Sequence, residues 1–178
     1  MRVITGSARG RRLNVLPGED VTRPTSERVK EGVFSAIQFD IEGRAVLDLF
    51  AGSGQMAIEA LSRGASYATL VDADAKACEI IRGNLEHTGF QNARVIKSDY
   101  AAFLSGTGEN FGLIFLDPPY NSGLLEKAAA ACVRLLNVGG LVICEHSKDY
   151  QMPGIDGLNL IKSLRYGRTS VSIFRKAD

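Results

Sequence analysis

AVLDLFAGSGQMA, residues 45–57, decides the fold, because an apolar run leads directly into a glycine-rich turn. The apolar run is typical of a strand that is buried in a parallel sheet. The turn fits the pattern G-x-G-x-x-A between a strand and a helix. Glycine at these positions lets the backbone approach a ligand closely and directs helix N–H groups at an anionic group. The stretch therefore predicts a strand–turn–helix unit that binds a ligand at its turn.

Short apolar runs alternate with segments of helical periodicity on the carboxyl side of this stretch. The runs are residues 45–50, 67–72, 93–98, 111–117 and 140–145, and the helical segments are about 54–64, 74–88 and 122–136. This alternation indicates parallel strands joined by crossover helices. Two extended segments that meet near Gly167 predict an antiparallel hairpin at the sheet edge. We therefore expect an α/β fold with a mostly parallel sheet.

The first 22 residues differ from the rest of the chain. RVIT and RRLNVL are short strand candidates on either side of a turn with the sequence SARG. We expect residues 1–22 to form a basic β-hairpin extension and residues 23–178 to form the main domain. Pro24 suits the first turn of a helix, whose core stripe would be Val29, Val33, Phe34 and Ile37.

The composition is that of a globular domain with unevenly distributed charge. Of 178 residues, 45% are hydrophobic, and 21 Lys and Arg balance 20 Asp and Glu. Residues 1–31 carry seven basic and four acidic side chains, and the last 24 residues carry five and two. Basic ends around an acidic middle suit a protein that binds a polyanion, although a solvated surface explains them equally well.

No apolar run is long enough to span a bilayer, and the opening residues lack the apolar core of a secretory signal. These two observations predict a cytoplasmic protein that does not contact membranes. The three cysteines, Cys78, Cys132 and Cys144, lie far apart, and the chain has two histidines. We interpret the cysteines as small buried hydrophobes, and we expect neither a disulfide framework nor a metal site.

Asp72 ends the second apolar run, 20 residues after Gly52. A carboxylate at this place accepts hydrogen bonds from ribose hydroxyls in nucleotide-binding folds. The glycine turn and Asp72 together predict a cofactor that contains a nucleoside, and both NAD and S-adenosylmethionine fit. The alternative is a structural glycine turn followed by an aspartate that caps a helix.

Asp117-Pro118-Pro119-Tyr120 follows the fourth apolar run directly. Open α/β proteins bind ligands at this carboxyl edge of the sheet. The prolines fix the backbone and remove two N–H donors, which leaves the carbonyls of Asp117 and Pro118 available as acceptors. Together with the Asp117 carboxylate, they could orient the exocyclic amine of a base for methyl transfer, and Tyr120 could stack on that base. The alternative is a proline turn in which Asp117 serves only as a cap.

Asp99 follows the third apolar run, and Glu145 ends the fifth. Asp99 could accept a hydrogen bond from the adenine amine of the cofactor, or it could be the N-cap of the next helix. Glu145 and His146 could both reach the site, but we interpret His146 as a hydrogen-bonded edge residue.

The chain resembles the RsmD family of bacterial ribosomal RNA guanine-N2 methyltransferases in four segments and in their order. In chain order, these segments are RVITGSARGRRL, RPTSERVKEGVFSAI, VLDLFAGSGQMAIEALSRGA and FLDPPY. The resemblance covers nearly the whole chain. It implies a Rossmann-like class I methyltransferase domain with a seven-stranded sheet. It also implies a specific activity, which is transfer of a methyl group from S-adenosylmethionine to a guanine N2 amine in 16S rRNA of the small ribosomal subunit. The product would be S-adenosylhomocysteine, and no metal is implied.

The resemblance also assigns residues. The catalytic residues would be Asp117, Pro118, Pro119 and Tyr120. The cofactor contacts would come from Arg23, Thr25, Asp48, Phe50, Ala51, Gly52, Ser53, Gly54, Asp72 and Asp99. RNA would be bound by Arg9, Arg11 and Arg12, for which the alternative is again a solvated surface. Asp72 stands where the family usually has Glu, and QMAIEA replaces a run of smaller residues, so we expect altered cofactor affinity.

The sequence leaves four other functions open. DPPY-type sites also serve adenine-N6 and glutamine methyltransferases, although the glutamine enzymes usually have Asn at the position of Asp117. A non-catalytic RNA-binding assembly factor could keep the pocket as a cofactor sensor. An NAD-dependent oxidoreductase would leave the DPPY segment unexplained. We expect a monomer.

Overall fold

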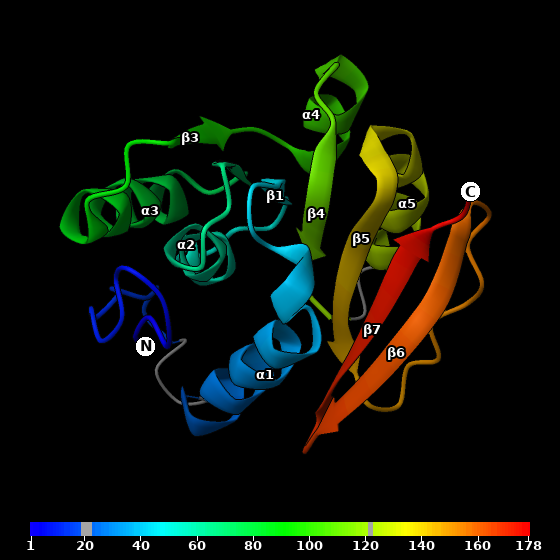
Figure 1. Cartoon of the computed structure of the whole chain (residues 1–178), viewed down its shortest axis with the longest axis horizontal. Coiled ribbons are helices and arrows are strands. Elements are labelled where there is room, and N and C mark those ends of the chain that lie inside the picture. The colour runs from blue at the N-terminus through cyan, green and yellow to red at the C-terminus, as the bar shows by residue number, and fades with distance from the viewer. Residues whose placement is uncertain (19–22, 121–122) are drawn as a thin grey trace.

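The computed structural model describes residues 1–18, 23–120 and 123–178, with the backbone alone for residues 23–25. Its strands are β1 (Ala45–Asp48), β2 (Tyr67–Asp72), β3 (Ala93–Lys97), β4 (Phe111–Leu116), β5 (Leu136–Ser147), β6 (Leu158–Tyr166) and β7 (Thr169–Lys176). Within the described residues they form one seven-stranded sheet in the order β3-β2-β1-β4-β5-β7-β6 (Figure 1). The first five strands of this order pair in parallel. β7 pairs antiparallel with β5 and with β6, which confirms the α/β fold and its C-terminal hairpin.

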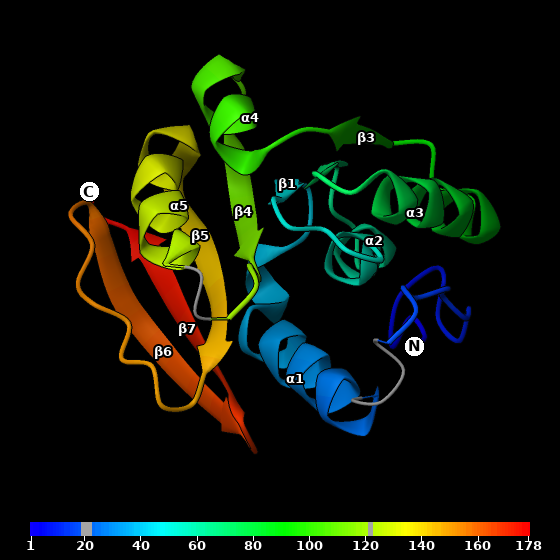
Figure 2. The same cartoon turned by 180° about the vertical axis from the view of Figure 1, so that it is seen from behind.

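Helices cover both faces of the sheet. They are α1 (Arg23–Ala36), α2 (Gln55–Ser62), α3 (Ala75–Thr88), α4 (Tyr100–Gly106) and α5 (Leu124–Cys132), with short 3-10 turns η2 (Gln38–Asp40) and η3 (Val133–Leu135). The buried faces of α1, α2 and α3 form one core with the side chains on one face of the sheet. The buried faces of α4 and α5 form a second core with those on the other face. Figure 2 shows α5 in front of β5, whereas in Figure 1 it lies behind β5.

The expected core stripe of α1 is confirmed. Val29, Val33, Phe34 and Ile37 are all buried. The ring of Phe34 lies 5.7 Å from the ring of Phe115 on β4, so α1 packs directly on the middle of the sheet.

β5 begins earlier than the sequence indicated. It begins at Leu136, because Leu136 already pairs with Phe111 on β4. Gly139, with a left-handed φ of 70°, lies within the strand. The pairing register between β4 and β5 shifts between Phe111 and Leu113. This irregularity interrupts the apolar pattern, so the sequence shows only residues 140–145 as a strand.

The N-terminal segment forms a closed loop in place of the two expected strands. A single antiparallel bridge joins Arg2 and Arg12. The Val3 N–H donates to the Arg11 carbonyl, and the Leu13 N–H donates to the Met1 carbonyl, each over 2.9 Å. Val3, Ala8 and Leu13 are buried in the core beside α2 and α3, so the loop is part of the folded body.

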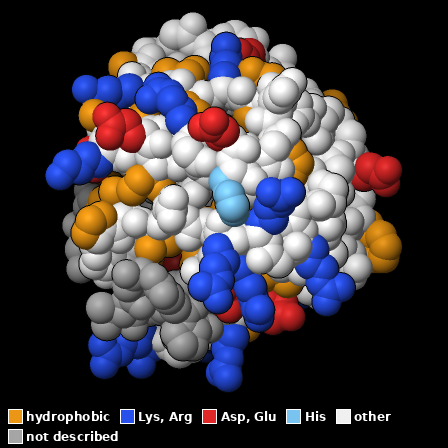
Figure 3. All heavy atoms as spheres, turned by 90° about the vertical axis from the view of Figure 1, so that its left-hand side faces the viewer, with side chains coloured by type: hydrophobic (Ala, Val, Ile, Leu, Met, Phe, Trp, Pro, Cys, Tyr) orange, Lys and Arg blue, Asp and Glu red, His pale blue; other side chains and the backbone are white. Residues whose placement is uncertain are grey.

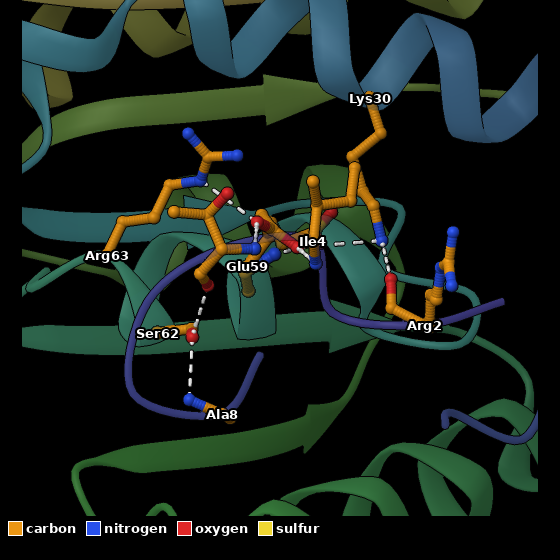
Figure 4. Close-up of polar contacts among 10 residues, drawn as sticks. Arg2, Ile4, Ala8, Lys30, Glu59, Ser62 and Arg63 are labelled. Carbon is orange, nitrogen blue, oxygen red and sulfur yellow. Dashed lines mark hydrogen bonds and ion pairs between the residues drawn. The ribbon is translucent and has the colours of Figure 1, made fainter. Parts of the chain in front are cut away.

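Buried polar side chains of α2 hold this loop in place (Figure 4). The Glu59 carboxylate accepts hydrogen bonds from the N–H groups of Ile4 and Thr5 at 2.8 and 3.0 Å. It also pairs with Lys30 of α1, whose ammonium lies 3.7 Å away. Burial lowers the pKa of Lys30, and Glu59 partly opposes this shift. The Ser62 hydroxyl accepts from the Ala8 N–H, so one turn of α2 fixes the loop at several points.

The three cysteines are free and buried, as expected. Burial raises the pKa of the Cys132 thiol to about 12, so this side chain is a hydrophobe at neutral pH. No helix in the described part of the chain is long and apolar enough to cross a membrane.

Candidate active site

One cavity of about 720 Å³ opens at the carboxyl ends of the parallel strands. This volume is in the range of pockets that bind small molecules and cofactors. Its walls include the glycine turn after β1, the end of β2, the segment after β4 and the end of β5. Met1, Val15 and Leu16 of the N-terminal segment also line it, so this segment contributes to the site.

The glycine turn has the backbone geometry that its sequence predicts. Gly52 and Gly54 have φ values of 55° and 79°, in the left-handed region that favours glycine. A Cβ atom at Gly54 would lie 3.0 Å from Leu70 and 3.3 Å from Ile81, so a side chain there would push α2 away from its neighbours. Phe50, Ala51, Gly52 and Ser53 line the cavity. Gly54 packs close to Leu70 and Ile81 and is not among the residues that line the cavity.

Asp48 is a buried carboxyl group at the floor of the cavity. It ends β1 and is 4% exposed. Its carboxylate accepts a hydrogen bond from the Ala57 N–H at 3.3 Å. Burial raises the pKa of Asp48 to about 7, because the charged form is poorly solvated there. A cation placed in the cavity would therefore interact favourably with the ionised form.

Asp72 closes the glycine turn as well as lining the cavity. Its carboxylate accepts hydrogen bonds from the Gly52 N–H at 2.8 Å and the Asp74 N–H at 2.9 Å. A carboxylate has about four acceptor positions, so these two bonds orient it and leave it able to accept from a ligand.

Asp99 caps a helix and lines the cavity at the same time. It accepts hydrogen bonds from the N–H groups of Ala101 and Ala102 in the first turn of α4. The N-cap alternative is therefore present in the structure, and the two roles are compatible.

The polar groups of this half of the cavity fit S-adenosylmethionine. Its ribose hydroxyls and adenine amine need acceptors, and its sulfonium and ammonium groups need negative charge. Asp48, Asp72 and Asp99 supply carboxylates to the lining of the cavity. Among the described residues, the Gln55 Oε1 is a buried acceptor without a hydrogen-bond partner, and Gln55 lines the same cavity. A ligand with hydrogen-bond donors would satisfy it.

Asp117, Pro118, Pro119 and Tyr120 line the other half of the cavity, at the end of β4. The Tyr120 hydroxyl donates to the Glu145 carboxylate over 3.3 Å and lies 3.3 Å from the Thr169 hydroxyl. Burial raises the pKa of Tyr120 to about 12, so it remains a neutral phenol. Because 45% of its surface is exposed, the ring is held at its hydroxyl end but is accessible to a planar group.

Glu145 belongs to the site, whereas His146 does not line it. Glu145 lines the cavity from the end of β5. Desolvation raises the pKa of its carboxyl group, although the hydrogen bond from Tyr120 opposes this. The rings of His146 and Tyr150 pack edge to face, and the His146 nitrogens bond the Ser147 carbonyl and the Ser172 hydroxyl, each at 2.9 Å. His146 is thus a hydrogen-bonded edge residue, as expected.

The expected RNA-binding arginines lie away from the cavity lining. Arg9, Arg11 and Arg12 are exposed on the N-terminal loop, and the Arg11 guanidinium donates to the His87 carbonyl at the end of α3. Lys and Arg side chains are numerous on the side of the molecule that carries this loop (Figure 3). The side chains of Arg23 and Thr25 lie outside the described residues. Among the described residues, no group of three or more His, Cys, Asp or Glu could hold a metal ion.

The family model described as "Conserved hypothetical protein 95" matches residues 1–175. The chain belongs to this family, the RsmD family. It is 39% identical to the provisionally named rRNA methyltransferase YlbH of Bacillus subtilis, over 99% of both chains. It is 33% identical to the ribosomal RNA small subunit methyltransferase D of Haemophilus influenzae, over 98% of this chain and 93% of the relative.

A solved structure shares the whole fold. The provisionally named methyltransferase yhhF of Escherichia coli superposes with a TM-score of 0.89 at 32% identity, covering 99% of this chain and 97% of that one. The RsmD-family chain described here therefore has a methyltransferase fold, with the glycine turn and the DPPY segment facing one cavity.

Proposed function

We propose that this RsmD-family protein transfers a methyl group from S-adenosylmethionine to the N2 amine of a guanine in 16S rRNA of the small ribosomal subunit. The observation that carries the proposal is the meeting of two half-sites in one cavity. The glycine turn and its carboxylates lie at the carboxyl ends of β1, β2 and β3, Asp117 through Tyr120 follow the neighbouring β4, and both groups line the same cavity. The curated names of the relatives support ribosomal RNA as the substrate.

The cofactor half-site would hold S-adenosylmethionine through its carboxylates and its turn. Asp72 would accept from the ribose hydroxyls, and Asp99 would accept from the adenine amine. Asp48 and the backbone of residues 50–54 would surround the methionine part of the cofactor. Arg23 and Thr25 are proposed to complete this half-site. When bound, the cofactor supplies a methyl group on a sulfonium, which is an excellent leaving group.

The target half-site would prepare the amine for attack. The lone pair of an exocyclic amine is delocalised into the base, which makes it a poor nucleophile. The Asp117 carboxylate and the Pro118 carbonyl would accept its two N–H bonds, orient the lone pair toward the methyl carbon and stabilise the developing positive charge. When the amine takes the methyl group and the sulfur leaves as a neutral thioether, Asp117 or water would accept one N–H proton.

Alignment would supply most of the remaining rate acceleration. Tyr120 would stack on a base that has been turned out of the RNA, and its hydroxyl contacts with Glu145 and Thr169 limit rotation of the ring. Pro119 would hold Tyr120 in this place, because its ring restricts the backbone. The same groups would suit adenine N6, so the proposal of guanine as the target rests on the family resemblance and not on these acceptors.

The Asp117→Ala variant tests this division of the cavity. We expect it to lower the rate of methyl transfer to small ribosomal subunits by about 10²-fold or more. The affinity for S-adenosylmethionine, measured by calorimetry, should stay within about threefold of wild type, because Asp117 lies in the target half-site. An equal loss of transfer and of cofactor affinity would show that Asp117 is a cofactor residue and would contradict the proposed role.

A further inference from the structure

Glu145 lies next to Asp117 across two neighbouring strands. Leu116, the last residue of β4, pairs in register with Cys144 on β5, so Asp117 and Glu145 directly follow this pair toward the carboxyl end. Neighbouring strands lie about 4.8 Å apart. Because side chains alternate along a strand, Glu145 shares the sheet face of Ile143 within β5, and Asp117 follows the last residue of β4. Asp117, Ile143 and Glu145 all line the cavity.

The Glu145 carboxylate has a fixed position and spare acceptor capacity. The Tyr120 hydroxyl donates to its Oε1 over 3.3 Å. Since Tyr120 uses its single proton in that bond, Thr169 is the donor in the 3.3 Å contact between the two hydroxyls. A carboxylate accepts about four hydrogen bonds, and Tyr120 takes one. Glu145 can therefore accept from a donor in the cavity while it orients the ring on which the base would stack.

Guanine and adenine differ at the ring atom beside the exocyclic amine. In guanine, the N2 amine is next to N1–H, which is a donor. In adenine, the N6 amine is next to N1, which carries a lone pair. A carboxylate beside the amine therefore gains a charge-assisted hydrogen bond with guanine. With adenine, it faces a second acceptor, and neither group is satisfied.

We propose that Glu145 selects guanine over adenine, by accepting the N1–H of the target base while Asp117 and Pro118 hold the neighbouring amine. The inference rests on the proposed function. It adds what the DPPY segment alone lacks, which is a contact that distinguishes the two bases. Glu145 is thus a specificity-determining residue in contact with the substrate.

The test removes one hydrogen-bond partner at a time from the protein and from the base. Small ribosomal subunits are reconstituted with guanosine or with 2-aminopurine riboside at the nucleotide that the wild-type protein methylates. The analogue keeps the exocyclic amine and lacks N1–H. We expect the wild-type kcat/KM to fall about 10–100-fold on the analogue, because Glu145 then faces a lone pair.

Glu145→Gln should change the ratio of the two rates. The Gln amide can donate to the N1 lone pair of the analogue, so the penalty should shrink at least about fivefold. The lower intrinsic reactivity of the analogue cancels in this comparison between variants. Glu126→Gln is the matched control, because exposed Glu126 on α5 also bonds a tyrosine hydroxyl, that of Tyr150, but does not line the cavity. It should keep the wild-type ratio.

Three results are separable. A wild-type ratio in Glu145→Gln, with unchanged cofactor affinity and melting temperature, would overturn the inference and leave the proposed function standing. If Glu145→Gln does not fold, Glu145→Asp replaces it, and a carboxylate withdrawn by one methylene should also reduce the analogue penalty. An unchanged penalty in this variant would overturn the inference. Absence of any transfer from wild type to the guanosine subunits would overturn the proposed function and this inference with it.

Discussion

Asp48 is a buried carboxyl group that destabilises the folded protein when it is ionised, and a cationic ligand in the cavity would offset this loss of stability. It is 4% exposed, and burial raises its pKa to about 7. Above pH 7 the protein without cofactor therefore contains a poorly solvated negative charge in this cavity. S-adenosylmethionine brings a sulfonium and an ammonium group, so binding would favour the ionised form. The ionised Asp48 carboxylate would therefore lower the stability of the protein without cofactor and raise its affinity for the cofactor.

The affinity for S-adenosylmethionine should depend on pH through Asp48. Above pH 7 the carboxyl group is ionised and affinity is highest. Below pH 7 it is protonated, and affinity should fall by up to about tenfold per pH unit. Asp48→Asn should bind more weakly at pH 8 and lose this dependence, as calorimetry at several pH values would show. A wild-type affinity that stays constant between pH 6 and 8 would contradict the role of Asp48.

The same substitution should stabilise the protein without its cofactor. The raised pKa means that the folded state holds its proton more tightly than the unfolded chain, so Asp48 reduces stability as the pH rises toward 7. At pH 8 we expect Asp48→Asn to raise the free energy of unfolding by about 1–4 kcal/mol. At pH 5.5 the gain should be about half as large, because the loss of stability accumulates from the unfolded pKa near 4 up to the folded pKa near 7. Thermal denaturation at both pH values measures the difference, and an equal or absent gain would contradict it.

Single site residues could be predicted from the sequence where the backbone conformation requires one residue type. Contacts between side chains that lie far apart in the chain could not be predicted. Gly52 and Gly54 were identifiable because few other residues adopt their left-handed backbone. The contact of Glu145 with Tyr120 depends on the register of β5 against β4. A one-residue shift in that register would have placed Glu145 on the opposite face, so the sequence could suggest its reach but not its partner.

At the scale of elements, the N-terminal loop depends on side chains of α2 and α3. Glu59 and Ser62 hold its first half. The Asn84 side chain exchanges hydrogen bonds with the backbone of Asn14 and also donates to the Ser53 carbonyl in the glycine turn. The loop is therefore connected to the cofactor half-site through one buried amide.

Glu59→Ala should be strongly destabilising. It leaves the buried Lys30 ammonium without its carboxylate, and it removes the acceptor for two backbone N–H groups. Breaking a buried pair in this way costs about 3–5 kcal/mol. Urea denaturation should show this loss. Glu79→Ala on the exposed side of α3 is the control and should change stability by less than about 0.5 kcal/mol. A similar small loss in Glu59→Ala would contradict the structural role of Glu59.

The strands of the parallel sheet were predictable because each is buried on both faces and reads as an apolar run. The N-terminal loop was not, because its conformation comes from polar contacts to residues more than 50 positions away. Its residues have strand-forming character, but one bridge between Arg2 and Arg12 is the extent of their pairing. The division at residue 22 remains a prediction, although the loop shares a core with the main domain.

At the scale of the whole molecule, the proposed RNA contacts and the cavity lie on different parts of the surface. Arg9, Arg11 and Arg12 are on the N-terminal loop, while Met1, Val15 and Leu16 of the same segment line the cavity. A segment that reaches both places could position RNA relative to the site.

The double variant Arg11→Ala/Arg12→Ala should weaken RNA binding and reduce its salt dependence. Each lost phosphate contact should lower the slope of log affinity against log salt concentration by about one. Cofactor affinity should not change. Titration of 16S rRNA at several salt concentrations measures the slope, with Lys127→Ala as a control, because Lys127 is an exposed basic residue on α5. An unchanged slope in the double variant would indicate that these arginines are only solvated.

Identification of the methylated nucleoside tests the central claim most directly. Small ribosomal subunits are incubated with the protein and S-adenosylmethionine that carries a labelled methyl group, and the RNA is digested to nucleosides. We predict that the label appears in N2-methylguanosine. Label in N6-methyladenosine would contradict guanine as the target and Glu145 as its selector. Absence of label despite tight cofactor binding would contradict the proposed activity altogether.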